Sequence, residues 1–404
     1  MNASRFAFAA LVAAAPLAAL FAAPAELQIK YGTLIAEKPA TAEEIAAVKA
    51  AYLAEKKSSS RPVAIQLKES VDDATLAAVV AAFPDAAEVR IDGKKGVTSL
   101  APLAALKGTL RKLEARNIRP LDLAPLAGAT ALEKADFMYS KIDDLSPLAS
   151  CPAIREVNVY GAELKDFSPL AACPKLECVN FYAAKLTPEG YATLGALKNV
   201  KKFHGGLTKM TSLAWLAGVP QTEELKVFAE KIDDFSPIAT LSRLTYFRAW
   251  NMSGDSLSSA LGDLAFLKDA TALKTLELPG SSYSDLEALS GLAALEKLDL
   301  SESNCAVDFN FAKNLPSLRT LIVSGRRGRS AKPREVVNLE ALAACPKLER
   351  LELVNVTATS LAPLMDSPKL SSVTVSKGAF SAEEIAALTA KMKTHAKNAR
   401  VTER

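Results

Sequence analysis

LEKADFMYSKIDDLSPLASCPA, residues 132–153, is one copy of a unit that recurs along most of the chain. A copy typically starts with an apolar residue and carries further apolar residues three and five positions later. Most copies begin 22 residues after the previous one. Internal repetition at this period predicts a solenoid, in which each copy forms one coil and stacks on its neighbours. The copies begin at Leu110, Leu132, Ile154, Leu176, Val200, Thr222, Leu244, Leu273, Leu295, Leu318, Leu348 and Leu370.

The repeat resembles that of leucine-rich-repeat proteins, in the 22-residue form of bacterial internalin-like proteins, whose pattern is L-x-x-L-x-L followed by a short convex turn. The resemblance covers about residues 86–380 and is carried by copies such as LEKLDL at 295–300. It implies an α/β solenoid: a right-handed horseshoe with a parallel β-sheet on the concave side, short 3-10 or helical turns on the convex side, and helical caps. Fold alone says little about function.

One position departs from the family pattern. The asparagine expected eight residues after the first leucine is absent, so no asparagine ladder forms. The turn backbone must then find hydrogen bonds from hydroxyls or from other backbone groups, because buried polar groups are rarely unpaired. The replacements are Ser140, Ala162, Ala184, Thr208, Ser281, Ser303 and Gly378.

The chain divides into four segments. Residues 1–25 carry one charge, an apolar run and small residues at Ala23 and Ala25, which predicts a cleaved secretory signal peptide, with a retained membrane anchor as the alternative. Residues 26–98 form an N-terminal cap and an irregular opening repeat, residues 99–380 about 12 repeats, and residues 381–404 a C-terminal cap helix and tail. We expect a secreted, periplasmic or cell-envelope protein without a transmembrane segment once the signal is removed.

The caps should be helical, because a solenoid exposes its apolar interior at both ends. The N-terminal cap helix starts at a capping box, Thr41 with Glu44, and the C-terminal one at Ser381 with Glu384. In the opening repeat we expect strands at 63–67 and 88–91 and a helix from about 72 to 83. The LSPLA phrases should form tight helical turns, with an Asp or Ser capping free amides and the proline preset in φ.

Composition and motifs give no support to most enzyme classes. The chain has 404 residues, 50% of them hydrophobic, and a net charge of +4, which is too small to indicate a nucleic-acid partner. It lacks a phosphate-binding glycine loop, a paired-cysteine zinc motif and a nucleophile elbow, and its two histidines exclude a histidine-rich metal site. We expect no cofactor and no metal.

A cysteine hydrolase is the remaining catalytic hypothesis. Cys178 and His204 would face outward as diagonal neighbours on adjacent strands, with Asn180 beside the histidine, but no oxyanion hole is evident. The alternative is an inert thiol. The remaining cysteines include three before proline at one repeat position, which indicates a small packing slot rather than a disulfide framework. These three are Cys151, Cys173 and Cys345.

The seventh repeat position should lie on the concave face and is rich in rings. Neighbouring strands are about 4.8 Å apart, so these side chains would form a row. Exposed aromatic residues gather at binding interfaces, although the rings could also pack on loops or on each other. A gap at Gly206 would leave a notch between Tyr182 and Phe228. The row is Met138, Tyr160, Tyr182, Gly206, Phe228 and Trp250.

The fifth repeat position adds a charge pattern that changes from acidic through neutral to basic and back. It favours a peptide or protein ligand over a uniform polymer, with ordinary solvated charge as the alternative. His204, Lys226 and Arg248 form its basic part and join the aromatic row as candidate ligand-binding residues. The full set is Glu114, Asp136, Asn158, Asn180, His204, Lys226, Arg248, Glu277 and Asp299.

Two insertions lengthen the repeat. Residues 254–270 should add a helical turn on the convex side. A basic segment, residues 326–334, could contact phosphate or an acidic glycan, or be a mobile solvated loop. Its cations are Arg326, Arg327, Arg329, Lys332 and Arg334.

The sequence therefore predicts an exported leucine-rich-repeat protein that binds a protein or peptide partner through its concave face. The alternatives are an envelope-associated structural or adhesion protein that contacts glycan, and a thiol hydrolase that uses Cys178 and His204.

Overall fold

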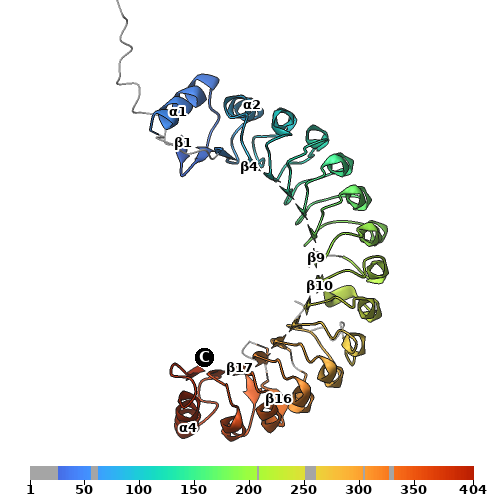
Figure 1. Ribbon diagram of the computed structural model, residues 1–404, viewed down its shortest axis with the longest axis vertical. Coiled ribbons are helices and arrows are strands. Elements are labelled where there is room, and N and C mark those ends of the chain that lie inside the picture. Colours follow the sequence, from blue (N-terminus) through green and yellow to red (C-terminus); the bar gives the residue numbers. More distant parts are fainter. Residues whose placement is uncertain (1–25, 56–61, 207–208, 251–260, 304, 327–331) are drawn as a thin grey trace, which may run out of the picture.

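The computed structural model describes residues 26–404 except 56–61, 207–208, 251–260, 304 and 327–331. The predicted signal peptide therefore lies outside the described residues. The described chain forms an open arc with strands along its inner side and helical turns along its outer side (Figure 1). Among the described helices, none is long and apolar enough to cross a membrane.

One sheet of 17 strands lines the concave side. Its strands pair in chain order and in parallel, apart from the antiparallel hairpin of the first two. The strands are β1 (Leu27–Lys30), β2 (Thr33–Ala36), β3 (Ala64–Leu67), β4 (Glu88–Asp92), β5 (Lys112–Arg116), β6 (Lys134–Asp136), β7 (Glu156–Asn158), β8 (Cys178–Asn180), β9 (Lys202–Gly205), β10 (Glu224–Phe228), β11 (Tyr246–Trp250), β12 (Thr275–Glu277), β13 (Lys297–Asp299), β15 (Thr320–Ser324), β17 (Arg350–Val354), β19 (Ser372–Val375) and β20 (Arg400–Glu403).

The register confirms the repeat phase expected from the sequence. Third positions pair with third positions, as in Cys178 with Lys202, and fifth with fifth, as in Asn180 with His204. All twelve residues that begin the repeats are buried, including Thr222, whose hydroxyl donates to the Val219 carbonyl at 2.7 Å. The leucine-rich-repeat fold follows from this alternation of buried and outward side chains along each strand.

Short 3-10 turns cover the convex side. In the Ser-Pro turns an aspartate two residues before the serine accepts from the free N–H of that serine. The Ser146 N–H donates to Asp144 at 2.7 Å, and the Ser168 N–H donates to Asp166 at 2.8 Å. The prolines lie in the first turn, as predicted. The 3-10 elements are η2 (Ala101–Leu106), η3 (Ala124–Leu126), η4 (Ser146–Ser150), η5 (Ser168–Ala172), η6 (Thr193–Ala196), η7 (Ala214–Gly218), η8 (Ala229–Lys231), η9 (Ser236–Thr240), η10 (Ala265–Leu267), η11 (Glu287–Gly291), η12 (Phe309–Asn314), η13 (Leu339–Ala344) and η14 (Ala362–Asp366).

Hydroxyls and backbone groups replace the missing asparagine ladder. Buried Ser140 accepts from the Ile118 N–H at 3.1 Å and donates to the Ala115 carbonyl at 3.2 Å, so it links two coils. Where alanine stands, the backbone bonds directly, as from the Lys185 N–H to the Ala162 carbonyl at 2.9 Å. The expectation is confirmed for these turns, whereas the Gly378 N–H instead donates to the Glu403 carboxylate at 2.9 Å. Thr208 lies outside the described residues.

Helices close both ends of the arc. In the N-terminal part, α1 (Ala42–Glu55) begins at the predicted Thr41 capping box, and α2 (Asp73–Ala82) follows the N-cap Asp72. In the C-terminal part, α4 (Ala382–Lys393) begins at the Ser381 capping box. The β1–β2 hairpin and the last strand, β20, were not predicted. The exact division at residues 98 and 380 stays a prediction.

The basic segment differs from the expectation of a solvated loop. Its last cation, Arg334, is 1% exposed and starts β16 (Arg334–Val337), which pairs in a small parallel sheet with β14 (Val307–Asp308) and β18 (Val356–Thr357). The Arg334 guanidinium donates to the carbonyls of Leu300 and Cys305. Arg334 is therefore part of the coil interior.

The remaining residues of the two insertions are only partly described. Lys332 is exposed, and the Arg326 carbonyl accepts from the Asn355 amide at 2.6 Å, while Arg327 and Arg329 lie outside the described residues. In the other insertion, residues 261–270 contain η10, and residues 254–260 lie outside the described part of the chain. The expected extra helical turn stays a prediction.

Candidate interaction face

Five rings stack along one margin of the concave sheet. Tyr139 meets Tyr160 edge to face, with centroids 5.2 Å apart and an interplanar angle of 84°. Tyr160 and Tyr182 lie parallel, 4.9 Å apart at 4°, and Tyr182 stacks on Trp250 at 5.9 Å and 18°. Phe228 meets Trp250 at 6.1 Å and 65°. We call these five side chains the aromatic row.

The notch expected at Gly206 is absent, and that expectation is wrong. A Cβ placed on Gly206 would lie 2.2 Å from Cε2 of Tyr182 and 2.4 Å from Cζ2 of Trp250. The two rings therefore meet over the glycine. Trp250 leaves β11 and reaches back past β10 to the residue that follows β9, so the row contains no gap where a ligand group could seat.

One residue of the predicted row is covered rather than exposed. Phe228 pairs in register with Trp250 and lies outside the core of the coils, but it is only 6% exposed because Trp250 packs against it. Met138 is half-buried, and the ring stack passes through its neighbour Tyr139 instead. Tyr160, Tyr182 and Trp250 remain partly exposed, as expected.

Tyr139 was missed by the sequence analysis and is the most exposed ring of the row, at 46%. It occupies the eighth repeat position, where the next coil has Gly161. A Cβ on Gly161 would lie 2.5 Å from the Tyr139 ring, so the glycine makes room for it. A tyrosine facing a glycine in the next copy was the available signal.

The fifth repeat position holds the row in place. The side chain of Asn158 accepts from the N–H of Tyr160 at 3.0 Å, and Asn180 accepts from the N–H of Tyr182 at 3.1 Å. Asp136 binds the Met138 N–H in the same way, at 3.0 Å. These polar groups fix the backbone where each strand ends and thereby direct the rings. Asp136 is also bound by Arg116 at 2.7 Å, so its charge is engaged within the sheet.

The basic part of the fifth position surrounds one carboxylate. Glu224 contacts His204 Nε2 at 2.9 Å, Lys226 Nζ at 2.7 Å and Lys202 Nζ at 3.9 Å. The hydrogen bond from His204, followed by that from Lys226, lowers the pKa of Glu224 to about 2 against the opposing effect of burial. Glu224 therefore stays ionised at neutral pH, and its single negative charge is smaller than the summed positive charge of Lys202 and Lys226.

Arg248 joins this basic part to the aromatic row. Its guanidinium lies 4.9 Å from the Trp250 ring centroid and 3.6 Å from Glu277. Glu277 is almost buried and is also bound by Lys297 at 2.6 Å and by the Tyr246 hydroxyl at 2.7 Å. Lys226 lies 5.0 Å from the Tyr246 centroid. Arg248 and Lys226 therefore each lie over an aromatic ring and are held in place by a neighbouring carboxylate.

The geometry disfavours a reactive thiol at Cys178. Cys178 and His204 are diagonal neighbours, as predicted, but the imidazole is bonded to Glu224. Burial, followed by the nearby charge of Glu156, raises the pKa of Cys178 to about 11, so the thiolate needed for attack is scarce at neutral pH. The buried cysteines of the repeated slot instead donate to carbonyls of the preceding coil, as Cys151 does to Leu126 at 3.3 Å.

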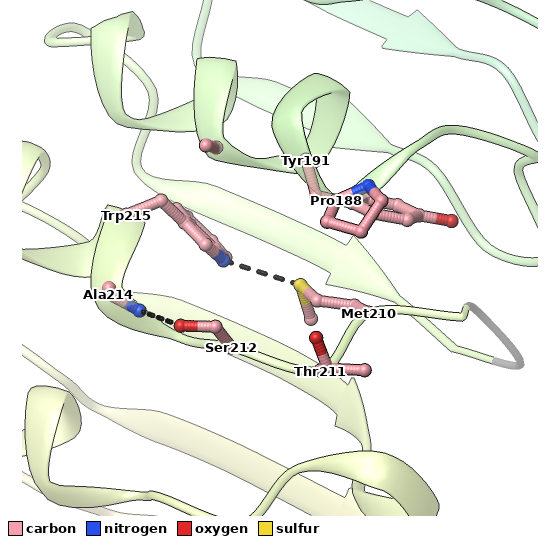
Figure 2. Close-up of a pocket in the computed structure, with 8 residues that line it drawn as sticks. Pro188, Tyr191, Met210, Thr211, Ser212, Ala214 and Trp215 are labelled. Atoms are coloured by element: carbon pink, nitrogen blue, oxygen red, sulfur yellow. Dashed lines mark hydrogen bonds between the residues drawn. The ribbon is translucent and has the colours of Figure 1, made fainter.

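One small pocket lies away from this face, between α3 (Pro188–Ala192) and η7 (Figure 2). Tyr191, Met210 and Trp215 line it, and the Trp215 indole N–H donates to the Met210 sulfur at 3.3 Å. It offers about 60 Å³, which is too little for a substrate. Among the described residues, no cluster of three or more His, Cys, Asp or Glu could hold a metal ion.

Comparison with known proteins identifies the fold. The chain matches no protein-family model and no curated protein sequence. It is similar to the crystal structure of an internalin from Listeria monocytogenes, with 19% identity, a TM-score of 0.60 and coverage of 83% of this chain and 88% of the other. It is also similar to a leucine-rich-repeat protein of Leptospira interrogans, with 12% identity, a TM-score of 0.58 and coverage of 83% and 89%. The chain therefore has the leucine-rich-repeat fold of internalin-like proteins.

Proposed function

We propose that the protein binds a protein or peptide partner through its concave face, along the aromatic row. The observation that carries the proposal is a continuous set of rings outside the hydrophobic core of the coils, of which all but Phe228 are at least partly exposed. Tyrosine and tryptophan contribute large contact area at low entropic cost, and they are enriched at protein interfaces.

The stacking favours a protein over a glycan. A sugar usually binds an aromatic side chain by lying on its flat face. Trp250 has Tyr182 and Arg248 against it, and Tyr160 lies between Tyr139 and Tyr182. Ring edges and phenol hydroxyls are what remains for a ligand, and these suit the side chains and backbone groups of a polypeptide.

The proposal includes export to the cell envelope or beyond, and no catalytic role. Export rests on the signal-like sequence of residues 1–25. The absence of a catalytic role is supported by the raised pKa of Cys178 and by the engagement of His204 with Glu224.

The test compares a row variant with a matched control. In the row variant, Tyr139→Ala and Tyr160→Ala remove two rings at the most exposed end of the row. Alanine is suited to the left-handed turn position of Tyr139, because Ala183 occupies the same repeat position with φ of 52°. The control, Tyr31→Ala, removes a fully exposed ring from the hairpin of the N-terminal cap.

The immobilised protein, the row variant and the control are each exposed to an envelope extract, and the bound proteins are quantified by mass spectrometry. We expect some proteins of the extract to be retained by the unaltered protein and by the control, and to be at least tenfold less abundant on the row variant. Truncating a true interface anchor costs about 2 kcal/mol or more. Equal retention by all three proteins would reject the aromatic row as the binding surface.

A further inference from the structure

We infer that the partner presents a carboxylate, from Asp or Glu, beside an apolar side chain, and that a cationic centre next to Trp250 binds this carboxylate. The cationic centre is Lys202, His204, Lys226 and Arg248 on β9, β10 and β11. This inference deepens the proposed function and rests on it.

The first step is the local charge. On β9 to β11 the outward third and fifth positions hold three full cations and His204, and Glu224 is the carboxylate among them. Glu224 is shared between Lys202, Lys226 and His204, and its pKa is lowered accordingly. One carboxylate leaves a positive excess here, so a second carboxylate from a partner would be attracted.

The second step is the position of this excess. The nearest acidic side chains on the flanking strands are already engaged: Glu156 on β7 contacts Lys134 at 2.8 Å, and Glu277 on β12 contacts Lys297 at 2.6 Å and Arg248 at 3.6 Å. When Glu277 and Lys297 are counted with the centre, the cations still outnumber the carboxylates. Asp299 is bonded to the Ser301 N–H at 2.9 Å. The positive excess is therefore confined to the middle of the sheet, beside the Trp250 end of the aromatic row.

The third step is preorganisation. Arg248 lies over the Trp250 ring, and Lys226 lies over the Tyr246 ring. Among the described atoms, Nε of Arg248 is buried and has no hydrogen-bond partner. Cations held on rings lose little further side-chain entropy when an anion binds. Because the ring edges of the row adjoin these cations, the matching ligand has an acidic side chain next to an apolar one.

The test selects peptides rather than assuming a partner. A phage library of random 12-residue peptides is selected in parallel on three immobilised proteins: the unaltered chain, the charge variant Lys226→Gln with Arg248→Gln, and a charge control. The control, Lys175→Gln with Lys347→Gln, removes two exposed cations from equivalent convex turns. Glutamine keeps the aliphatic stem that packs on the rings, so the charge variant alters little besides charge.

We expect the unaltered chain and the control to enrich peptides with Asp or Glu beside an apolar residue, and the charge variant not to. A second measurement does not depend on how the variant folds. In the best synthetic peptide, each acidic residue is replaced by its amide and binding to the unaltered chain is measured. We expect a loss of affinity of roughly fivefold for the critical carboxylate, as for a partly exposed ion pair.

Three results would overturn the inference. One is a selected pool without acidic enrichment, another is unchanged binding of the amide peptides, and the third is binding of dextran sulfate to the cationic centre without any acidic peptide. Failure of the proposed function is distinguishable, because selected peptides would then bind the Tyr139→Ala, Tyr160→Ala variant as well as the unaltered chain. Peptides that the row variant loses but that show no preference for acids would reject the inference alone. A selection that enriches no peptide would reject both.

Discussion

The replacement Gly206→Ala tests whether Tyr182 and Trp250 meet over the concave sheet. The added Cβ would lie 2.2 Å and 2.4 Å from their ring atoms, well inside van der Waals contact. Gly206 does not have a left-handed φ, so alanine brings no backbone strain of its own. Any destabilisation of the folded state must therefore come from contact with the two rings.

The magnitude follows from the two ways in which the clash can be relieved. If the rings stay, overpacking costs about 1–3 kcal/mol. If they turn away, the stacked Tyr182–Trp250 pair is lost, at about 0.5–1.5 kcal/mol, and Phe228 becomes exposed. Replacing glycine by alanine also restricts the unfolded chain, which returns about 0.4–1 kcal/mol. The net destabilisation should be about 1 kcal/mol.

The matched control is Gly108→Ala. Its Cβ would meet no atom within 4 Å, and its φ is also outside the left-handed region, so only the gain from the unfolded chain applies. Urea unfolding followed by far-ultraviolet circular dichroism should place the midpoint of Gly206→Ala below that of the unaltered chain and that of Gly108→Ala at or above it. Acrylamide quenching of tryptophan should increase only in Gly206→Ala. Equal midpoints and equal quenching in both variants would show that the rings do not occupy the space over Gly206.

Three further predictions concern the buried charges and the thiol. Cys178 should react with iodoacetamide at pH 8 about a hundredfold more slowly in the folded chain than in urea, because the pKa of its thiol is raised to about 11. The rate is measured by mass spectrometry of the peptide that contains Cys178, and equal rates in the folded and unfolded chain would contradict the prediction. Glu224→Gln should lower the free energy of unfolding by roughly 1–3 kcal/mol above pH 5. Because the pKa of Glu224 is lowered to about 2, the difference in stability between the variant and the unaltered chain should disappear as the pH falls from about 4.5 towards 2. A difference in urea midpoints that does not depend on pH would exclude the ion pair as its cause. Arg334→Ala should lower the free energy of unfolding by about 2 kcal/mol, because the carbonyls of Leu300 and Cys305 lose their donor. In the same assay the control Lys332→Ala should change it by less than about 0.5 kcal/mol. Equal effects of the two substitutions would show that Arg334 is solvated.

The fold was predictable from the sequence because each coil repeats the same local rule. The apolar residue at the start of each copy, the strand after it and the proline turn on the convex side all recur in phase, so one copy such as 132–153 is enough to place the others. The hairpin at β1 and β2 and the strand β20 escaped prediction. Each is used once, at an end of the sheet, so no repeat indicates it.

The candidate site was predictable only in part, for a physical reason. Alternation along a strand fixes which side chains face outward, and it placed Tyr160, Tyr182 and Trp250 correctly. It says nothing about how far a side chain leans across the sheet. Tyr182 and Trp250 belong to coils three strand spacings apart and meet over Gly206, and Trp250 also packs against Phe228, which is buried.

The error at Arg334 has a different physical cause. Five cations in a short segment indicate solvation when each is considered alone. The carbonyls of Leu300 and Cys305 lie in a coil that has Ser303 in place of the asparagine, and the Ser303 hydroxyl accepts from the Cys305 N–H at 3.2 Å. The long guanidinium of Arg334 donates to these carbonyls from the following coil. Its burial without a carboxylate lowers the pKa of Arg334.

The aromatic row lies outside the hydrophobic core of the solenoid, and this is the strongest support for the proposal that it binds a partner. The contiguous core runs from coil to coil through Phe137, Phe181, Phe203 and Phe247, and none of the five rings of the row belongs to it. A row needed only for folding would gain by burying Tyr139, yet that ring is 46% exposed above a glycine that leaves it room. Asn158 and Asn180 fix the backbone of Tyr160 and Tyr182, so the exposed rings are also held in one geometry. Exposed rings held rigid by their own coils lose little entropy on binding, so this arrangement favours an interface.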